Sequence, residues 1–448
     1  MHTSSEPRPV VLPRSTHCIS RSRIDPDALK VLYRLHHSGY KAYLVGGSVR
    51  DLLLGKSPKD FDVGTDAHPA EIRRLFRNCR IIGRRFRIAH IYFKGNKIIE
   101  VSTFRRNVPE EGPEGVEGEA AVRAAGTSIY GQPHEDAFRR DITINGLFYD
   151  IGTFSIIDYV GGMADLKDGI IRAIGDPERK FVEDPVRMIR ACRHAARTGF
   201  LIEEKTYRAI LAHADLVTTC NRSRLLEEFQ KDLTGGASRR SFELLKETGL
   251  LAAYLPAFSE YLDNEPLDRT CFYRPGWVWN ALEYLDRLEA EGPETDSAFY
   301  FIPLVFPLLE KRLLERAGAS DQEAAAAVEP TTVYESIREL TAPLALPRKY
   351  VERLTTTWIV MDRLEKALQK GFIPASLQKR PYFPFLLAAY RLKWISAGLG
   401  AETVEESIRE GLRKGTELSR SPAKRRRRRR RPRRRVGQER VREGPSKL

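Results

Sequence analysis

Two acidic side chains and a glycine turn are the residues of this sequence best suited to chemistry. Asp60 and Asp62 are separated by one residue, so on a strand they would project from the same face and could share a divalent cation. Gly46 and Gly47 come earlier in the chain. Because glycine has no Cβ, a polyanion can approach this backbone closely, and N–H groups at the start of a following helix can point at a phosphate. Together these residues indicate a site that holds a metal-bound triphosphate.

Strands and short helices must position these residues. The pattern predicts a strand at 40–45, then the glycine turn and a short helix, and then a second strand that carries both carboxylates. The region is therefore expected to form a mixed α/β sheet. Its other expected elements are helices at 25–39 and 68–76 and strands at 79–83, 88–93, 97–104, 155–160 and 170–174.

From residue 183 onward the pattern becomes helical. Val186, Ile189, Cys192 and Ala196 recur at spacings of three and four and form an apolar stripe, with arginines on the neighbouring face. Later helices are expected at 206–214, 224–233, 241–248, 278–289 and 351–370. We therefore expect an α+β protein in five parts: a flexible leader at 1–24, a head at 25–175, a helical neck at 176–265, a helical body at 266–415 and a disordered basic tail at 416–448.

Several motifs resemble one enzyme family. The segment from Leu44 to Asp51, followed by Lys59-Asp60-Phe61-Asp62, resembles the head of bacterial poly(A) polymerases and CCA-adding tRNA nucleotidyltransferases, within the polymerase beta superfamily. The stretches at 139–141 and 183–187 match the next two motifs in the family's order. The stretches at 81–86, 159–163 and 274–277, together with the C-terminal tail, resemble the poly(A) polymerases rather than the CCA-adding enzymes.

The resemblance implies a reaction and a metal. A 3′-hydroxyl would attack the α-phosphate of a nucleoside triphosphate, with two Mg²⁺ ions held by Asp60 and Asp62. Such a centre usually has a third carboxylate. Glu100 lies on an expected strand between apolar residues, where a lone acid needs an explanation, whereas the resemblance favours Asp141 as the active-site acid. A salt bridge to a neighbouring arginine is the alternative for either residue.

The resemblance also assigns a nucleotide site. Arg140, Asp141 and Asn145 would engage the ribose. Asp184 and Arg187 are three residues apart, so on a helix they would share a face. The carboxylate would accept from the adenine amino group and the guanidinium would donate to the adjacent ring nitrogen, although such a pair alone is usually a surface ion pair. The expected nucleotide-binding residues are Gly46, Gly47, Ser48, Arg50, Arg140, Asn145, Asp184, Arg187, Arg190 and Arg193.

Nearly all the positive charge lies at one end of the chain. The net charge is +15, and residues 420–448 contribute fifteen Lys or Arg against two Glu, a net of +13. Such a segment repels itself and has little apolar surface to bury, so it should stay disordered and bind RNA phosphates without sequence preference. A solubilising or membrane-surface tail is the alternative. The expected RNA-binding residues are Arg425, Arg428, Arg431 and Arg433.

Cysteine usage and hydropathy bear on the compartment. Five cysteines are scattered without a C-x-x-C pair, which argues against a disulfide framework or a zinc site and fits a reducing cytoplasm. The N-terminal residues lack the apolar core of a signal peptide. The longest apolar run, at 298–309, contains Pro303 and Pro307 and is too short to span a bilayer. We therefore expect a cytoplasmic protein without a transmembrane segment.

These observations predict a template-independent poly(A) polymerase that adds AMP from ATP to RNA 3′ ends, using Mg²⁺. CCA addition to tRNA uses the same chemistry and is the first alternative. An RNA-binding protein with an inactive catalytic head is the second, which the intact acidic residues argue against. The expected partners are RNA 3′ ends, ATP and RNA-decay or RNA-chaperone proteins.

Overall fold

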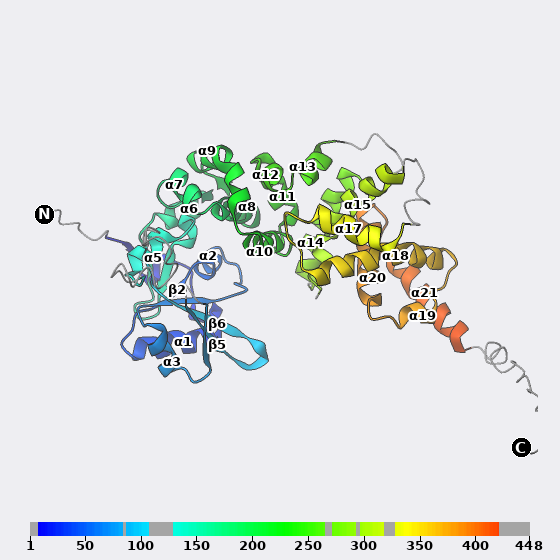
Figure 1. Cartoon of the computed structure of the whole chain (residues 1–448). Coiled ribbons are helices and arrows are strands. Elements are labelled where there is room, and N and C mark those ends of the chain that lie inside the picture. Colours follow the sequence, from blue (N-terminus) through cyan, green and yellow to red (C-terminus); the bar gives the residue numbers. More distant parts are fainter. Residues whose placement is uncertain are drawn as a thin grey trace, which may run out of the picture. The chain divides into compact units, whose positions relative to one another are not determined.

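The computed structural model describes residues 8–83, 87–106, 129–264, 271–292, 296–317 and 328–420. It confirms an α+β protein, with a mixed-sheet head followed by helices (Figure 1). The chain divides into two compact units, which are described separately. The first comprises residues 1–295 with 340–346, and the second comprises 296–339 with 347–448.

An eight-stranded sheet forms the centre of the head, in the order β1-β8-β7-β2-β3-β6-β5-β4. The β3·β6 pair is parallel and the other pairs are antiparallel. Leu44, Val63 and Val101 are fully buried on neighbouring strands, so apolar burial holds the centre of the sheet together. The strands are β1 (Val10–Leu12), β2 (Ala42–Val45), β3 (Asp62–Thr65), β4 (Cys79–Ile82), β5 (Ile88–Tyr92), β6 (Ile98–Thr103), β7 (Leu147–Asp150) and β8 (Ile156–Asp158).

Two helices of the head, α1 (Pro26–His37) and α3 (Pro69–Leu75), pack against the sheet. The sequence dictates where α1 begins, because the Asp25 side chain accepts from the backbone N–H groups of Asp27 and Ala28 and a proline occupies the first helical position. The other helices of the head are α2 (Gly47–Leu53), α5 (Pro133–Arg139) and α6 (Gly162–Asp168).

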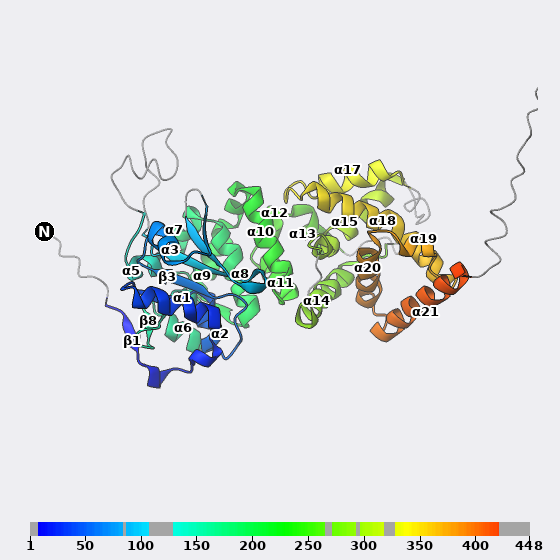
Figure 2. The same ribbon diagram turned by 90° about the horizontal axis from the view of Figure 1, so that it is seen from below.

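The expected flexible leader is wrong for residues 8–24. β1 pairs with β8 at the edge of the sheet (Figure 2), and Ile19 is fully buried. Arg23 donates from its guanidinium to the carbonyl oxygens of Leu52 (3.4 Å) and Lys56 (2.9 Å), just after α2. The polar, proline-containing composition masked a short apolar run that completes the sheet. Residues 1–7 lie outside the described part.

The neck is helical, as expected. The predicted apolar stripe lies on α8 (Val186–Thr198), where Val186, Ile189 and Cys192 are buried. A short parallel pair, β9 (Ile170–Ile171) with β10 (Leu201–Ile202), lies beside it. The helices are α7 (Pro177–Glu183), α8, α9 (Glu204–His213), α10 (Arg222–Leu233), α11 (Ser238–Glu247), α12 (Leu250–Tyr254), α13 (Pro256–Asp263) and α14 (Pro275–Glu291). Since α14 packs on α11 within the first unit, the neck extends past the expected boundary at 265.

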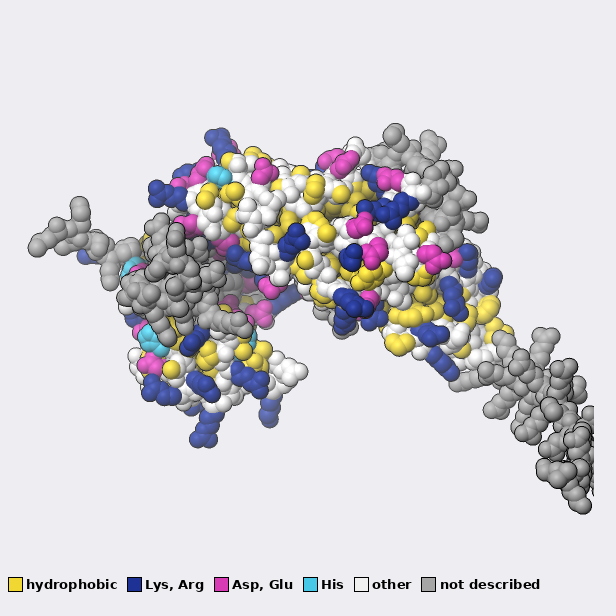
Figure 3. Space-filling model, viewed as in Figure 1, with side chains coloured by type: hydrophobic (Ala, Val, Ile, Leu, Met, Phe, Trp, Pro, Cys, Tyr) yellow, Lys and Arg dark blue, Asp and Glu magenta, His cyan; other side chains and the backbone are white. Residues whose placement is uncertain are grey.

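The second unit is all helical. It contains α15 (Ile302–Ala317), most of α17 (Pro330–Leu340), α18 (Arg348–Gln369), α19 (Ala375–Gln378), α20 (Phe383–Ser396) and α21 (Ala401–Arg420). Because α21 continues to Arg420, residues 416–420 are helical rather than part of a disordered tail. The tail arginines expected to bind RNA, at 425, 428, 431 and 433, lie outside the described residues. In Figure 3 acidic and basic side chains are interspersed over the helical part of the described surface.

No helix in the described ranges combines the length and the apolar character that crossing a bilayer would require.

Candidate active site

The strand register brings Asp62 next to the glycine turn. Val45, the last residue of β2, lies opposite Asp62, the first residue of β3, and Gly46 follows Val45 directly. Gly46 has φ 70° and ψ −136°, a backbone conformation that favours glycine. Asp60 precedes the strand instead of lying on it, so the expectation that the strand carries both carboxylates is wrong. The two carboxylates still interact, because the charge of Asp60 raises the pKa of Asp62.

The electrostatics around Asp62 favour a cation. The surrounding protein, the Glu100 carboxylate and then that of Asp60 raise the pKa of Asp62 to about 6, against the opposing effect of Arg140. The residue itself remains exposed. A carboxylate whose ionised form is disfavoured by like charges gains most from a nearby positive ion. The site therefore has the charge pattern of a cation site.

Glu100 and Asp141 occupy different surroundings. Glu100 lies opposite Asp62 in the parallel β3·β6 pair, and its side chain is 48% exposed. Asp141 is buried; its Oδ1 accepts from the N–H of Ile142 at 2.9 Å, and its Oδ2 lies 2.8 Å from the guanidinium of Arg190. Burial alone would raise the pKa of Asp141, but Arg190 and the other polar groups lower it overall. Of the two candidates for third carboxylate, the register places Glu100 beside Asp62.

The donor set fits magnesium only with help from a substrate. Among the described residues, no three His, Cys, Asp or Glu side chains form a complete metal-binding cluster. Mg²⁺ commonly uses one or two carboxylates, several waters and substrate phosphates. Asp60 and Asp62, with Glu100 nearby, supply such a partial set of hard oxygen ligands.

Behind the glycine turn, three buried side chains join α2 to the neck. Arg50 donates from Nη1 to Asn145 Oδ1 at 2.9 Å and to His194 Nδ1 at 3.1 Å, and its Nε and Nη2 donate to Asp51. His194 Nε2 lies 3.1 Å from the Asn145 amide nitrogen. Burial and Arg50 lower the pKa of His194 well below its usual range, so the ring is neutral. A neutral ring accepts at one nitrogen only, so Arg50 and the Asn145 amide compete for it.

A buried acid holds the second arginine of the motif at 139–141. Arg140 donates to Asp136 Oδ2 from Nε (3.1 Å) and Nη2 (2.9 Å), and Arg139 bonds the other oxygen. Arg140 Nη1 is 3.2 Å from where a Cβ on Gly46 would lie. The glycine therefore leaves the room that the guanidinium occupies beside the turn. Sequence reasoning missed Asp136 and His194, although Asp136 stands four residues before Arg140, the usual spacing of a helical ion pair.

The expected base-reading pair is present, with one change in its local structure. Asp184 has φ −152° and ψ 89° and lies between α7 and α8, so it does not share a helix with Arg187 as predicted. The two side chains still approach to 3.7 Å, and Arg224 also pairs with Asp184 at 2.6 Å. Asp184 Oδ1 and Arg187 Nη1 are both buried without a hydrogen-bond partner. Adjacent side chains thus present one acceptor and one donor without a hydrogen bond, and the nearest acid to that donor is Glu183, whose Oε2 lies 3.9 Å from Arg187 Nη1.

Three other residues expected to bind the nucleotide, Ser48, Arg190 and Arg193, have different partners in the structure. Ser48 is buried and donates from its hydroxyl to the Val45 carbonyl at 2.9 Å, which fixes the turn. Arg190 pairs with Asp141. Arg193, expected to bind the nucleotide, is instead buried in the neck between Glu228 (2.5 Å) and Asp232 (2.6 Å) on α10. Its charge is matched there, so the structure gives it a packing role.

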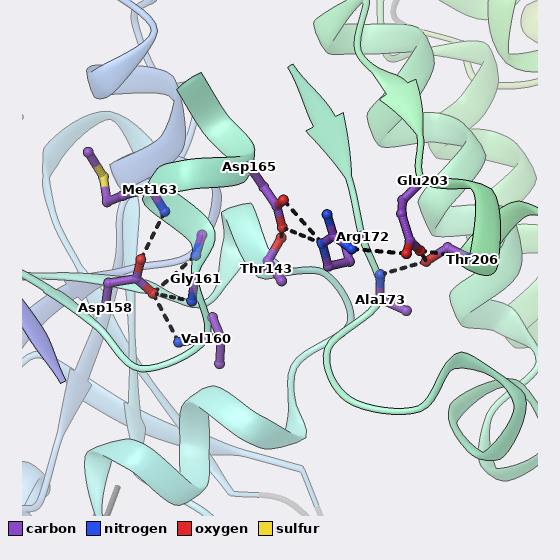
Figure 4. Close-up of polar contacts among 11 residues, drawn as sticks. Thr143, Asp158, Val160, Gly161, Met163, Asp165, Arg172, Ala173, Glu203 and Thr206 are labelled. Atoms are coloured by element: carbon purple, nitrogen blue, oxygen red, sulfur yellow. Dashed lines mark hydrogen bonds and ion pairs between the residues drawn. The ribbon is translucent and has the colours of Figure 1, made fainter. Parts of the chain in front are cut away.

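A polar network supports the segment that carries Asn145 (Figure 4). Thr143 donates to Asp165 on α6 at 2.6 Å, Arg172 bonds Asp165 at 3.1 Å, and Arg172 continues to Glu203 at 2.9 Å. Beside it, Asp158 accepts four backbone N–H groups, from Val160, Gly161, Gly162 and Met163. These contacts fix the segment Thr143–Asn145 to the start of α9.

Comparisons with known proteins agree with this arrangement. The family model described as the poly A polymerase head domain matches residues 42–172. A second, described as the probable RNA and SrmB-binding site of polymerase A, matches residues 199–262.

Curated relatives match over most of the chain. Poly(A) polymerase I of Escherichia coli O6:H1 is 39% identical over 87% of this chain and 82% of that protein. The enzyme of the same name from Haemophilus influenzae is 35% identical over 86% and 84%. A CCA-adding enzyme of Geobacillus thermodenitrificans is 31% identical over 80% and 79%.

Solved structures support the fold. A tRNA-processing enzyme in an apo form superposes with a TM-score of 0.57 at 22% identity, over 87% of this chain and 98% of that one. A CCA-adding enzyme in complex with CTP gives 0.53 at 22% identity, over 89% and 85%. At this identity the likeness concerns the fold alone.

Proposed function

Because this chain belongs to the poly(A) polymerase I family, with an RNA-binding region after its nucleotidyltransferase head, we propose that it extends RNA 3′ ends with AMP from ATP in a magnesium-dependent reaction. The family of nucleotidyltransferases typically uses divalent metals. Asp60 and Asp62 would hold Mg²⁺ in this chain. Bound there, the ion supplies charge neutralisation at the phosphates and acidifies the attacking hydroxyl.

The protein groups around the metal position the nucleotide. Gly46 and Gly47 leave the backbone open to the phosphates, and Arg140 stands beside Gly46 as a cation fixed by Asp136. The backbone oxygen of Asn145 accepts from Arg140 Nη1 at 3.4 Å, and its side-chain oxygen accepts from Arg50 at 2.9 Å. Preorganised donors of this kind stabilise charge in the transition state without having to reorganise. We assign the ribose to Asn145 and the phosphates to the glycine turn and Arg140.

One observation carries the choice of base. Asp184 Oδ1 and Arg187 Nη1 are a buried acceptor and a buried donor without partners. Buried polar atoms normally have partners, and the edge of adenine offers an amino donor next to a ring acceptor. Guanine and uracil present the reverse pattern at the same edge. Cytosine shares the adenine pattern, so this pair rejects G and U, and the size of the pocket must separate A from C.

RNA binding would involve two parts of the chain. Residues 199–262 match an RNA-binding model, and the basic tail adds unspecific attraction to phosphate. Deleting residues after Ser421 should weaken RNA binding and lower its salt dependence while leaving ATP affinity unchanged. RNA-decay or RNA-chaperone proteins would be its protein partners, and the cytoplasm its compartment.

A nucleotide-choice assay tests the function. The purified protein would be incubated with Mg²⁺ and either a generic RNA or tRNA lacking CCA, with ATP or CTP supplied singly. We expect long AMP additions to both RNAs and no CMP incorporation. Addition of CMP to the truncated tRNA would make the protein a CCA-adding enzyme, and no incorporation of either nucleotide would leave an RNA-binding relative without activity.

A further inference from the structure

A basic cavity is lined by residues of α2, of the segment between α2 and Asp60, and of the end of α8. It has a volume of about 110 Å³. A space of this size can hold several waters or a phosphate group. Its walls carry Arg50, Asp51, Lys56, Lys59, Arg197 and Thr198.

The charges of this cavity do not balance. Arg50 and Asp51 satisfy one another, and Lys59 pairs with Glu289 at 2.7 Å. Lys56 Nζ donates to the backbone oxygen of Arg197 at 3.2 Å, which brings no negative charge. The half-buried Arg197 guanidinium makes no hydrogen bond or ion pair with any described residue. Two cations therefore face the cavity without an anion.

Burial makes this imbalance costly. Taking a cation out of water is unfavourable unless a partner compensates. Burial, together with Arg50, lowers the pKa of Arg197, while Asp51 and the more distant Asp60 act in the opposite direction. An anion in the cavity would remove the imbalance, and the hydroxyls of Ser57 and Thr198 at its walls can donate to phosphate oxygens.

The position of the cavity bears on whether that anion belongs to the nucleotide triphosphate or to the RNA backbone. Arg50 reaches both places, because its guanidinium lines the cavity and its Nη2 lies 3.5 Å from where a Cβ on Gly47 would be. Phosphates seated at the turn would therefore lie next to Arg50, and Lys56 and Arg197 are the cavity cations that belong neither to the turn nor to an ion pair with a described residue. Lys59 precedes the catalytic Asp60 directly, and Arg197 lies ten residues after Arg187 on α8, about 15 Å along the helix from the base-reading end.

We propose that this cavity binds a backbone phosphate of the RNA near its 3′ end, with Arg197 and Lys56 as its ligands. The proposal rests on the proposed function, which requires an RNA 3′ end at Asp60 and Asp62. Because Lys59 of the cavity wall directly precedes Asp60, a phosphate held by Arg197 and Lys56 would help to set the distance of the terminal hydroxyl from the metal-binding carboxylates.

The test compares Arg197→Gln and Lys56→Gln with wild type in the full chain. The matched control is Arg74→Gln, which removes one charge from the 78% exposed Arg74 of α3. Affinity for a short oligo(A) would be measured directly over a range of salt concentrations, together with the affinity for ATP. Each variant should lower the salt slope by about 0.7, equivalent to about a fivefold weaker affinity at 0.1 M salt, with ATP affinity unchanged.

Oligonucleotides with one uncharged methylphosphonate linkage identify the phosphate. Wild type should lose affinity at one linkage near the 3′ end, and Arg197→Gln should be insensitive to that same linkage. Weaker ATP binding with unchanged RNA binding would overturn the proposal by making the cavity a triphosphate site. Unchanged affinity for both would also overturn it. If Arg197→Gln melts at a lower temperature, the exposed Lys56 provides the decisive variant. Because binding is measured without turnover, a failed adenylation assay would not affect the result.

Discussion

Arginines of α8 differ in what they meet, even where they share a side of the helix. Arg193 packs against α10, where Glu228 and Asp232 pair with its guanidinium. Arg197 follows Arg193 by four residues and so lies on the same side of α8, yet no hydrogen bond or ion pair joins its guanidinium to a described residue. Arg187, at the start of the helix, has a buried donor atom without a hydrogen-bond partner. What separates these positions is the acids that neighbouring elements bring to them, and an arginine without a matching acid is the place to test for a ligand.

The largest effect on activity should follow from replacing Asp62, the carboxylate whose ionised form gains most from a nearby cation. Asp62→Asn should lower adenylation at least about 10³-fold, since the loss of a metal-binding carboxylate removes several kcal/mol of charge stabilisation. The melting temperature should stay the same or rise, because the surrounding protein and the neighbouring acids Glu100 and Asp60 disfavour the ionised form of Asp62. Single-turnover rates and thermal unfolding measure both. Asp168→Asn, at an exposed position of α6, is the control, and undiminished activity in Asp62→Asn would refute the metal assignment.

A substitution of Arg187 should affect nucleotide choice without affecting the fold. Arg187→Gln should lower kcat/KM for ATP by about 10- to 100-fold, the worth of a charged hydrogen bond, and reduce discrimination against GTP. Arg179→Gln, which alters the 85% exposed Arg179 of α7, is the control. If Arg187→Gln instead lowered stability and left ATP preference intact, Arg187 would have a structural role like that of Arg193.

A substitution of Asp232, which pairs with Arg193, should lower stability without affecting nucleotide choice. Asp232→Ala leaves the buried Arg193 with Glu228 alone and should lower the free energy of unfolding by about 3 kcal/mol. Adenylation per folded molecule should stay close to wild type. Urea unfolding measures the first quantity and kinetics well below the melting temperature the second. Glu227→Ala, at an exposed neighbouring position on α10, should change neither, and a loss of ATP affinity in Asp232→Ala would return Arg193 to the nucleotide site.

The smallest effect concerns pH. Burial alone would raise the pKa of Asp136, but Arg140 and Arg139 outweigh it and lower the pKa overall. A carboxylate with a lowered pKa contributes stability that is present above its ordinary range near pH 4 and is lost as the pH falls through the folded-state value. Urea unfolding between pH 7 and pH 3 should therefore show a weaker pH dependence in Asp136→Asn than in wild type. Parallel curves for the two proteins would contradict this.

The sequence was informative where function depends on local order. The glycine turn, the paired acids and the motifs at 139–141 and 183–187 are contiguous segments, and the structure places their residues around β2, β3 and α8. The sequence could not predict which long side chains from different helices and strands contact one another. Arg193 continues the series of arginines along α8, but only the tertiary position of α10 shows that two acids neutralise it. The preference for Glu100 beside Asp62 likewise depends on a parallel strand pairing that no local pattern encodes.

The edge strand β1 has a practical consequence for anyone who shortens or tags this protein. A truncation that starts at residue 25, where the first long helix begins, would expose one edge of β8 and remove the Arg23 contacts to the carbonyls of Leu52 and Lys56. The segment between α2 and Asp60 would then lose its two hydrogen bonds from Arg23. Loss of activity in such a shortened protein would result from the loss of these structural contacts and not from the loss of a catalytic group. Purification tags are therefore best placed before residue 8.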